Sequence, residues 1–178
     1  MVRIIEWNGT EIVAGIERLT DIMIDCIEGG ALVGHILPVD RDTIAAYWRD
    51  VAASTDAGER IVLIAEADGV EAGTVQLFLS PEPNAPHRAE VYKLLVHRDF
   101  RCRGLGEALM STVEDVAARY GRTLLLLDTV QNGAGERLYR RLGWEDIGVV
   151  PHHFVDPFGT PQASVYMMRH LRAETLTL

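Results

Sequence analysis

The chain has 178 residues, 48% of them hydrophobic, which is enough to bury a substantial core, so we expect one domain over residues 1–178 and no second one. A net charge of −9 argues against nucleic-acid binding and mildly favours a cationic small substrate. Charged residues interrupt the apolar stretches, so we expect no membrane span, no secretory signal and a cytoplasmic location. Two cysteines are too few for a disulfide framework or a zinc site, and we expect no metal.

Apolar spacing and turn residues predict strands and helices along the chain. Asp68-Gly69 is a hairpin signal, and the apolar run at 123–127 is typical of a strand covered on both faces. In chain order, the sequence predicts a strand at 2–6, a helix from Thr10 to Gly29, a helix from Asp40 or Asp42 to Val51, strands at 61–67, 72–79 and 89–96, a helix at 105–120, a strand at 123–127, a helix at 132–142, and strands at 144–150 and 163–168.

The most informative stretch is a strand that runs into a basic, glycine-rich turn and at once into a helix. Two glycines alone would indicate only a tight turn, but backbone N–H groups converge at such a helix start, and the helix dipole favours an anion there. The turn therefore suits a diphosphate, which glycines allow to approach the main chain. The spacing of the glycines disfavours the usual NAD and ATP sites. The turn consists of Arg101, Cys102, Arg103, Gly104, Leu105 and Gly106.

A second stretch, NGAGERLYRRLGW from Asn132 to Trp144, extends this pattern. With the turn that follows Val96, it resembles the two signatures of the GNAT superfamily of N-acetyltransferases, although Gly135 replaces the usual alanine and Trp144 the usual phenylalanine or tyrosine. The resemblance implies a single α/β domain with a central mixed, mostly antiparallel sheet, splayed parallel strands and flanking helices. It also implies acetyl-CoA as cosubstrate and direct transfer of the acetyl group to an amine.

The same resemblance indicates which residues would hold acetyl-CoA. Main-chain groups of Leu94, Leu95 and Val96 would pair with the pantetheine arm much as another strand would, and a backbone N–H there could stabilise the oxyanion. The turn from Arg101 to Gly106 would hold the diphosphate. Asn132 would either hydrogen-bond the pantetheine or cap its helix, and the sequence leaves both roles open.

Three side chains are candidates for the chemistry. The amine must be neutral to attack, so the reaction needs a proton acceptor, and Glu90 and Asp128 could reach one cleft from adjacent strands. The alternative for Glu90 is an exposed strand residue, and the alternative for Asp128 is a helix or loop cap. Tyr139 matches the tyrosine that donates a proton to the departing thiolate in the family, and its alternative is a core tyrosine.

Three shorter stretches, at 29–34, 88–94 and 127–129, resemble the tabtoxin-resistance acetyltransferases. This resemblance implies a small amino-acid-like or toxin-like amine as substrate, and homodimers are common in the family. The sequence leaves two other functions open. A non-catalytic acyl-CoA-binding sensor would need neither Tyr139 nor a carboxylate, and a protein N-acetyltransferase would need an open peptide groove.

Overall fold

A computed structural model describes residues 2–171, so residue 1 and residues 172–178 of the expected domain lie outside the described part. Its helices are α1 (Gly9–Ala14), α2 (Ile16–Glu28), α3 (Arg41–Asp56), α4 (Leu105–Arg119) and α5 (Ala134–Arg141), with a short 3-10 helix at Arg98–Phe100. Its strands are β1 (Val2–Trp7), β2 (Arg60–Ala67), β3 (Val70–Leu79), β4 (Arg88–Val96), β5 (Leu124–Val130), β6 (Glu145–Val155) and β7 (Pro161–His170).

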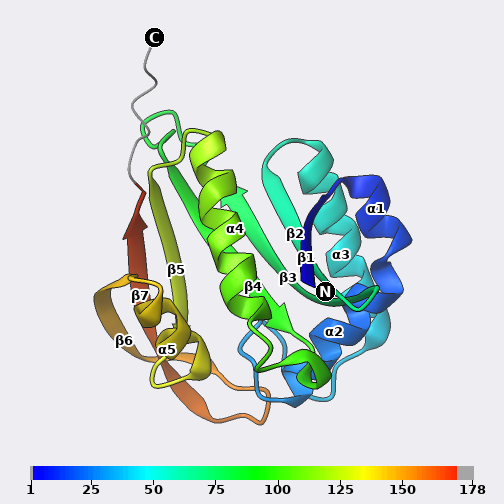
Figure 1. The fold of residues 1–178 in the computed structure, drawn as a ribbon. Helices are drawn as coiled ribbons and strands as arrows, with labels where there is room; N and C mark the ends of the chain where they lie inside the picture. Colours follow the sequence, from blue (N-terminus) through cyan, green and yellow to red (C-terminus); the bar gives the residue numbers. More distant parts are fainter. Residues whose placement is uncertain (1, 172–178) are drawn as a thin grey trace.

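The strands form one seven-stranded sheet in the order β1-β2-β3-β4-β5-β7-β6. Only the β4–β5 pair is parallel among the pairings of residues 2–171, and the other neighbours are antiparallel. Helices cover both faces of this sheet (Figure 1). The predicted fold class is therefore confirmed. None of the helices in this part of the chain is long and apolar enough to cross a membrane.

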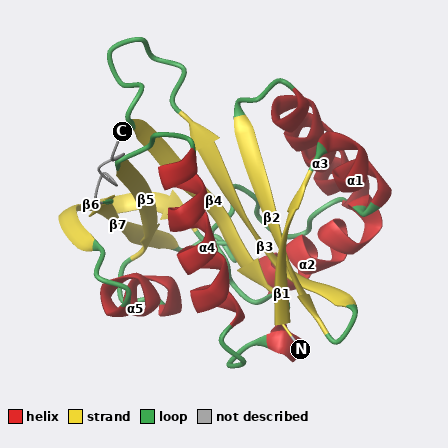
Figure 2. Ribbon diagram, turned by 45° about the horizontal axis from the view of Figure 1, so that its top comes forward, coloured by secondary structure: helices red, strands yellow, loops and turns green. Residues whose placement is uncertain are grey.

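Two hydrophobic cores lie on opposite faces of the sheet. In β2, Ile61 and Leu63 pack with α4, whereas Val62 and Ile64 pack with α1, α2 and α3. This alternation follows from the two-residue period of a strand. The helix α4 thus covers one face, and the three N-terminal helices cover the other (Figure 2).

A β-bulge in β4 separates this strand from β5. Lys93 has a positive φ of 52°, and the pairing of β4 with β3 slips between Thr74 and Gln76. A bulge of this kind bends the strand that carries it. The parallel pairing accordingly covers only Arg88–Glu90 and Leu124–Leu126. The two strands part beyond this point, as predicted, and the gap opens toward their carboxyl ends.

The single helix predicted from Thr10 to Gly29 is instead two helices, because the chain breaks at Gly15. A Cβ at Gly15 would lie 2.4 Å from the ring of Trp7. Glycine therefore leaves room for the Trp7 side chain at the junction of α1 and α2.

The predicted N-cap of this region is also corrected. Asn8, and not Thr10, caps α1: the Asn8 side chain accepts a hydrogen bond from the Glu11 N–H, and the Glu11 carboxylate accepts one from the Asn8 N–H. This reciprocal arrangement is a capping box. Of the two caps considered for α3, Asp40 is the one used.

The later elements are present with shifted ends. The helix α5 begins at Ala134 and not at Asn132, because Asn132 has a φ of 62° and Gly133 takes the N-cap position. The strand β5 continues to Val130, so Asp128 lies within a strand and is not a cap. Both strands of the final hairpin are longer than predicted.

Replacing Asn8 by alanine should lower the free energy of unfolding by about 1 kcal/mol, because α1 loses its capping side chain. Thr10→Ala is the matched control, since Thr10 is exposed in the first turn and should tolerate the change. Urea unfolding followed by circular dichroism measures both variants. A larger loss for the Thr10 variant than for the Asn8 variant would contradict this assignment of the cap.

Candidate active site

Asp128 lies at the gap where β4 and β5 part. Its carboxylate accepts a hydrogen bond of 2.9 Å from Oγ of Ser164, a residue with no exposed surface. Burial raises the pKa of Tyr139 on α5 and of Tyr166 on β7, and the negative charge of Asp128 raises both further. The Asp128 carboxylate thus acts electrostatically on side chains from two neighbouring elements.

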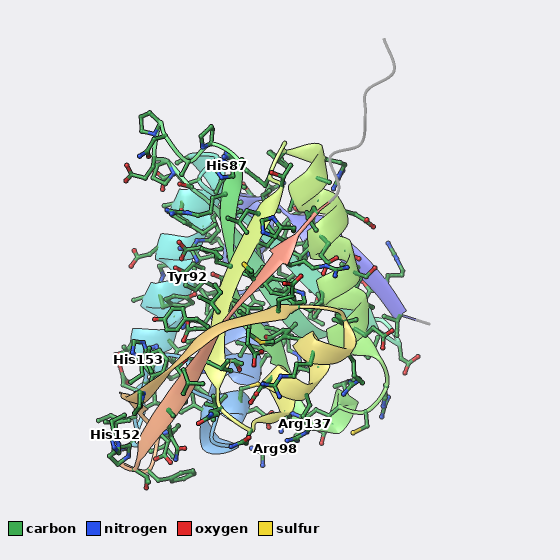
Figure 3. The ribbon with its side chains drawn as sticks, turned by 90° about the vertical axis from the view of Figure 1, so that its left-hand side faces the viewer. His87, Tyr92, Arg98, Arg137, His152 and His153 are labelled. Atoms are coloured by element: carbon green, nitrogen blue, oxygen red, sulfur yellow. The ribbon has the colours of Figure 1, made fainter. Side chains whose placement is uncertain are left out.

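Glu90 is the last residue of β4 that pairs with β5, where it lies opposite Leu126. Asp128 follows two residues beyond Leu126, so the two carboxylates lie on adjacent strands at the point of separation, as the sequence predicts. The Glu90 carboxylate accepts a hydrogen bond from the phenol of Tyr92. Burial and this bond raise the pKa of Tyr92 to about 12. Tyr92 extends to the side of the sheet where α3 lies (Figure 3).

An open pocket of about 280 Å³ lies on this side of the sheet, next to Glu90. It is lined by Tyr47, Arg60, Phe78, Tyr92 and Lys93. A second hollow, of about 310 Å³, lies around Trp7 and Tyr120 and contains none of the predicted site residues. Among residues 2–171, no group of three or more His, Cys, Asp or Glu side chains could hold a metal ion.

Tyr139 lies on the opposite face of the sheet, in the core beneath α4. It is 7% exposed, and its ring centroid lies 5.9 Å from that of Trp144. A phenol is protonated at neutral pH even without a shift, and the raised pKa of Tyr139 holds the proton more firmly. A Cβ at Gly135 would lie 2.8 Å from Oγ1 of Thr129 and 3.3 Å from the Tyr139 ring. This crowding explains why glycine stands where the family usually has alanine.

The glycine-rich turn joins β4 to α4 at the open end of the gap. Gly104 holds the N-cap position with a φ of 80°, and a Cβ there would meet no atom within 4 Å, so the main chain is accessible to an anion. At Gly106 a side chain would be crowded, because a Cβ would lie 3.2 Å from Leu138. Glycine therefore lets α5 pack closely against α4. Cys102 is an exposed free thiol with a φ of 59°.

The arginine side chains of the turn are engaged with protein groups. Arg101 Nε donates to the carbonyl of Val96 at 2.9 Å, and its Nη2 lies 3.6 Å from the carboxylate of Asp25. Arg103 Nη1 lies 3.8 Å from Asp68. A diphosphate at this turn would therefore meet main-chain N–H groups first.

Asp25 of α2 is a residue that the sequence reasoning missed. It is 7% exposed, and its carboxylate accepts hydrogen bonds from the backbone N–H of Arg98 at 2.9 Å and from the Arg98 guanidinium. It thereby fixes the segment that leads into the turn. An acidic residue on a helix facing the core is the only sequence signal for this role, and it does not reveal the partner.

Asn132 does not cap α5, since the helix has no side-chain cap. Its N–H donates instead to the carboxylate of Glu136, which is 3% exposed and lies 2.6 Å from Arg140. Glu136 was also missed, although glutamate at the third helical position is a known signal for a capping interaction. The exposed Asn132 side chain remains a predicted contact of the pantetheine.

The residues present fit acetyl-CoA. Beyond Glu90, β4 is not paired with β5, so the main chain from Leu94 to Val96 faces the gap between the strands. Leu95 and Val96 stay paired with β3 on the other side, which holds this edge in an extended form. The accessible main chain at Gly104 lies at the end of the same gap. A strand-like arm that ends in a diphosphate would match both features.

Several solved structures share this fold. The yncA structure from Salmonella typhimurium, solved with its cofactor acetyl-CoA, has a TM-score of 0.78 and 24% identity, and the match covers 97% of this chain and 95% of that one. An N-acetyltransferase structure from Staphylococcus aureus Mu50 has a TM-score of 0.80 and 16% identity, with 97% and 99% covered. At these identities the likeness shows an acetyltransferase-type fold.

Sequence comparison gives the family. Residues 16–144 match the Acetyltransferase (GNAT) family, and the chain belongs to this family. An uncharacterised N-acetyltransferase from the hisH-hisA intergenic region of Azospirillum brasilense is 32% identical over 112 residues, which are 62% of this chain and 65% of that protein. The uncharacterised N-acetyltransferase MJ1207 of Methanocaldococcus jannaschii is 38% identical over 63 residues, 35% of this chain and 28% of that protein. The chain therefore spans less than two thirds of the curated relatives that it matches.

Lys93 is the only lysine in the sequence, so its ionisation can be measured without ambiguity. Burial, followed by the positive charge of Arg60, lowers the pKa of Lys93 to about 8. In protein labelled with ¹³C-lysine, we expect one Cε resonance whose titration midpoint lies near pH 8, and Lys93→Met should remove it. A midpoint near the usual value for lysine, about 10.4, would show that the side chain is solvated.

Proposed function

We propose that the chain is an acetyl-CoA-dependent N-acetyltransferase that acetylates the primary amine of a small, amino-acid-like molecule. The gap between β4 and β5 is the observation that carries this proposal. It leaves strand backbone open for a pantetheine arm, with Asp128 on one face of the sheet and Tyr139 on the other. Acetyl-CoA supplies a thioester, whose carbonyl carbon forms a C–N bond with the amine as its C–S bond breaks.

The carboxylates of Glu90 and Asp128 attract the ammonium form of the amine and accept its proton. Both lie on the side of the sheet that carries the open pocket, so the amine would arrive from that side. Asp128 is held by Ser164, and Glu90 by the phenol of Tyr92, which leaves each carboxylate with further acceptor positions. Either residue can therefore act as the base.

Tyr139 donates a hydrogen bond to the sulfur that departs, and its proton neutralises the thiolate. Its raised pKa makes the phenol a weaker acid, so it acts chiefly as a hydrogen-bond donor, and the proton moves toward the sulfur only as negative charge develops there. Main-chain groups of Leu94, Leu95 and Val96 would hold the pantetheine, and the turn from Arg101 to Gly106 would hold the diphosphate. A backbone N–H of β4 would stabilise the oxyanion.

The size of the pocket and the residues around it favour a small substrate over a protein. A volume of about 280 Å³ suits a molecule of amino-acid size. The stretches that resemble the tabtoxin-resistance enzymes also meet here: Lys93 Nζ donates to the carbonyl of Val33 at 2.7 Å, and the charge of Asp128 acts on Lys93. Detoxification of an amino-acid-like compound is the physiological role that we favour. A non-catalytic sensor would need neither Tyr139 nor the carboxylates.

We further propose that residues 1–178 act as one cytoplasmic domain and form a homodimer. The edge strand β6 supports the dimer, because its apolar side chains Ile147, Val149 and Val155 are 55%, 45% and 52% exposed. Apolar edge strands favour association. Analytical ultracentrifugation should give twice the chain mass, and a chain mass that stays monomeric at high concentration would refute the dimer.

Tyr139→Phe should lower kcat by about 10²- to 10⁴-fold, because the departing sulfur loses its proton donor. Its dissociation constant for acetyl-CoA should change little, since the phenyl ring still packs against Trp144. Release of CoA thiol and calorimetry measure the two quantities. Tyr120→Phe, at an exposed tyrosine outside the gap, is the matched control and should behave like the parent protein.

Glu90→Gln and Asp128→Asn test the base. The variant that removes the base should lose about 10²- to 10⁴-fold in kcat/KM, while the other should lose much less. Both substitutions keep the shape of the side chain. If neither variant lowered kcat/KM by more than a few-fold, the proposed proton acceptor would be wrong.

A further inference from the structure

The pocket beside Glu90 holds two cations. Arg60 and Lys93 line it together with three aromatic rings, and no carboxylate of residues 2–171 lies within ion-pairing distance of either one. Their mutual repulsion is visible in Lys93, whose pKa is lowered by burial and then by the charge of Arg60. The charge of Asp128 acts on Lys93 in the opposite sense, but no carboxylate of the described residues forms an ion pair with either cation. Two like charges in one pocket without an ion-pair partner favour an anionic ligand.

Both cations are fixed in place by neutral groups. The Arg60 guanidinium lies 5.4 Å from the ring centroid of Phe78 and 5.9 Å from that of Tyr92, and it donates to Oε1 of Gln76. Its Nε is buried and has no hydrogen-bond partner among the described residues. A rigid guanidinium with an unused donor is suited to a carboxylate.

Lys93 is held in the same way. Its ammonium donates to the carbonyl of Val33 and lies 5.7 Å from the ring centroid of Tyr47. An ammonium has three N–H donors, so this contact leaves others for a ligand. The positive φ of Lys93 belongs to the bulge and aims its side chain at α3 and the loop before it.

The cations and the catalytic carboxylates lie on the same face of the sheet. Arg60 is opposite Phe78, and Phe78 is opposite Glu90, so the three residues form one row across β2, β3 and β4. Residues in such a row share a face, and two strand spacings separate Arg60 from Glu90 by roughly 10 Å at the backbone. The side chains of such a row can thus meet the two ends of one small zwitterion.

We propose that Arg60 and Lys93 bind the carboxylate of the acceptor, so that its amine is placed at Glu90 and Asp128. This proposal rests on the proposed function and narrows the substrate class to amines that carry a carboxylate. The aromatic rings of Tyr47, Phe78 and Tyr92 line the open pocket beside the two cations and would contact the apolar part of the acceptor.

The kinetic test compares amino acids with their carboxamides as acceptors, across a panel of matched pairs. Arg60→Met and Lys93→Met should each raise KM for the carboxylates by about 10- to 100-fold and change KM for the carboxamides much less. Arg60→Lys should recover part of the loss. Arg49→Met, an exposed position on α3 outside the pocket, is the matched control. Equal effects on both members of a pair, or no effect, would overturn the proposal.

A binding measurement tests the carboxylate site independently of the acetyltransferase activity. In ¹³C-lysine protein, a saturating amino acid that binds through its carboxylate should move the titration midpoint of Lys93 to higher pH, because an anion favours the charged ammonium, and the carboxamide should not. If no amine is acetylated but this shift occurs, the function fails and the carboxylate site stands. If only amines without a carboxylate are acetylated and no amino acid shifts the midpoint, the carboxylate site fails and the function stands.

Discussion

The bulge at Lys93 is the constraint on which the site depends. One extra residue in β4 bends the strand away from β5 after a short parallel pairing, and the gap that results exposes main chain that would otherwise be buried in the sheet. The bulge also directs the side chain of Lys93, the only lysine of the chain, into the pocket on the α3 side. One local distortion therefore creates both the gap proposed for a strand-like arm and the position of the charge proposed for the acceptor.

In the proposed mechanism, the two faces of the sheet hold different parts of the reaction. The turn before α4 and the buried Tyr139 lie toward the α4 and α5 side, where the departing group would be held. Glu90 and the cationic pocket lie on the α3 side, where the amine would enter. Asp128, at the gap, acts on ionisable groups of both sides. Transfer across a sheet is possible only where two neighbouring strands are not hydrogen-bonded, which is the arrangement that the bulge produces.

Much of this fold could be predicted from sequence, because periodicity and turn residues are local signals. The order of strands and helices and the glycine-rich turn followed from them, whereas the placing of Glu90 and Asp128 on adjacent strands followed from the resemblance to the family. The break at Gly15 was not predicted, and the close approach of the Trp7 ring that requires glycine there is visible only in the folded chain. The Asn8 cap was overlooked although Asn8 and Glu11 have the spacing of a capping box.

Only those residues of the candidate site that belong to local sequence motifs could be predicted. Motif residues such as Gly104 and Tyr139 carry a recognisable pattern, whereas Asp25 and Arg60 act through partners that are distant in sequence. A left-handed backbone at Lys93 also gives no sequence signal, because lysine is not a residue that favours it. The pocket proposed for the acceptor therefore could not be predicted, because its lining comes from β2, β3, β4 and α3, which are brought together only by folding.

The acetyltransferase activity is tested most directly by mixing the purified protein with acetyl-CoA and a panel of amino acids, dipeptides, polyamines and amino-acid-like toxins. Free CoA thiol is followed together with the acetylated product, which is detected by mass spectrometry. Amine-dependent thiol release with an equal amount of N-acetylated product from a small amine is the expected result. Tight binding of acetyl-CoA in calorimetry without thiol release from any amine would contradict it and would point to a protein that binds acetyl-CoA without catalysing transfer.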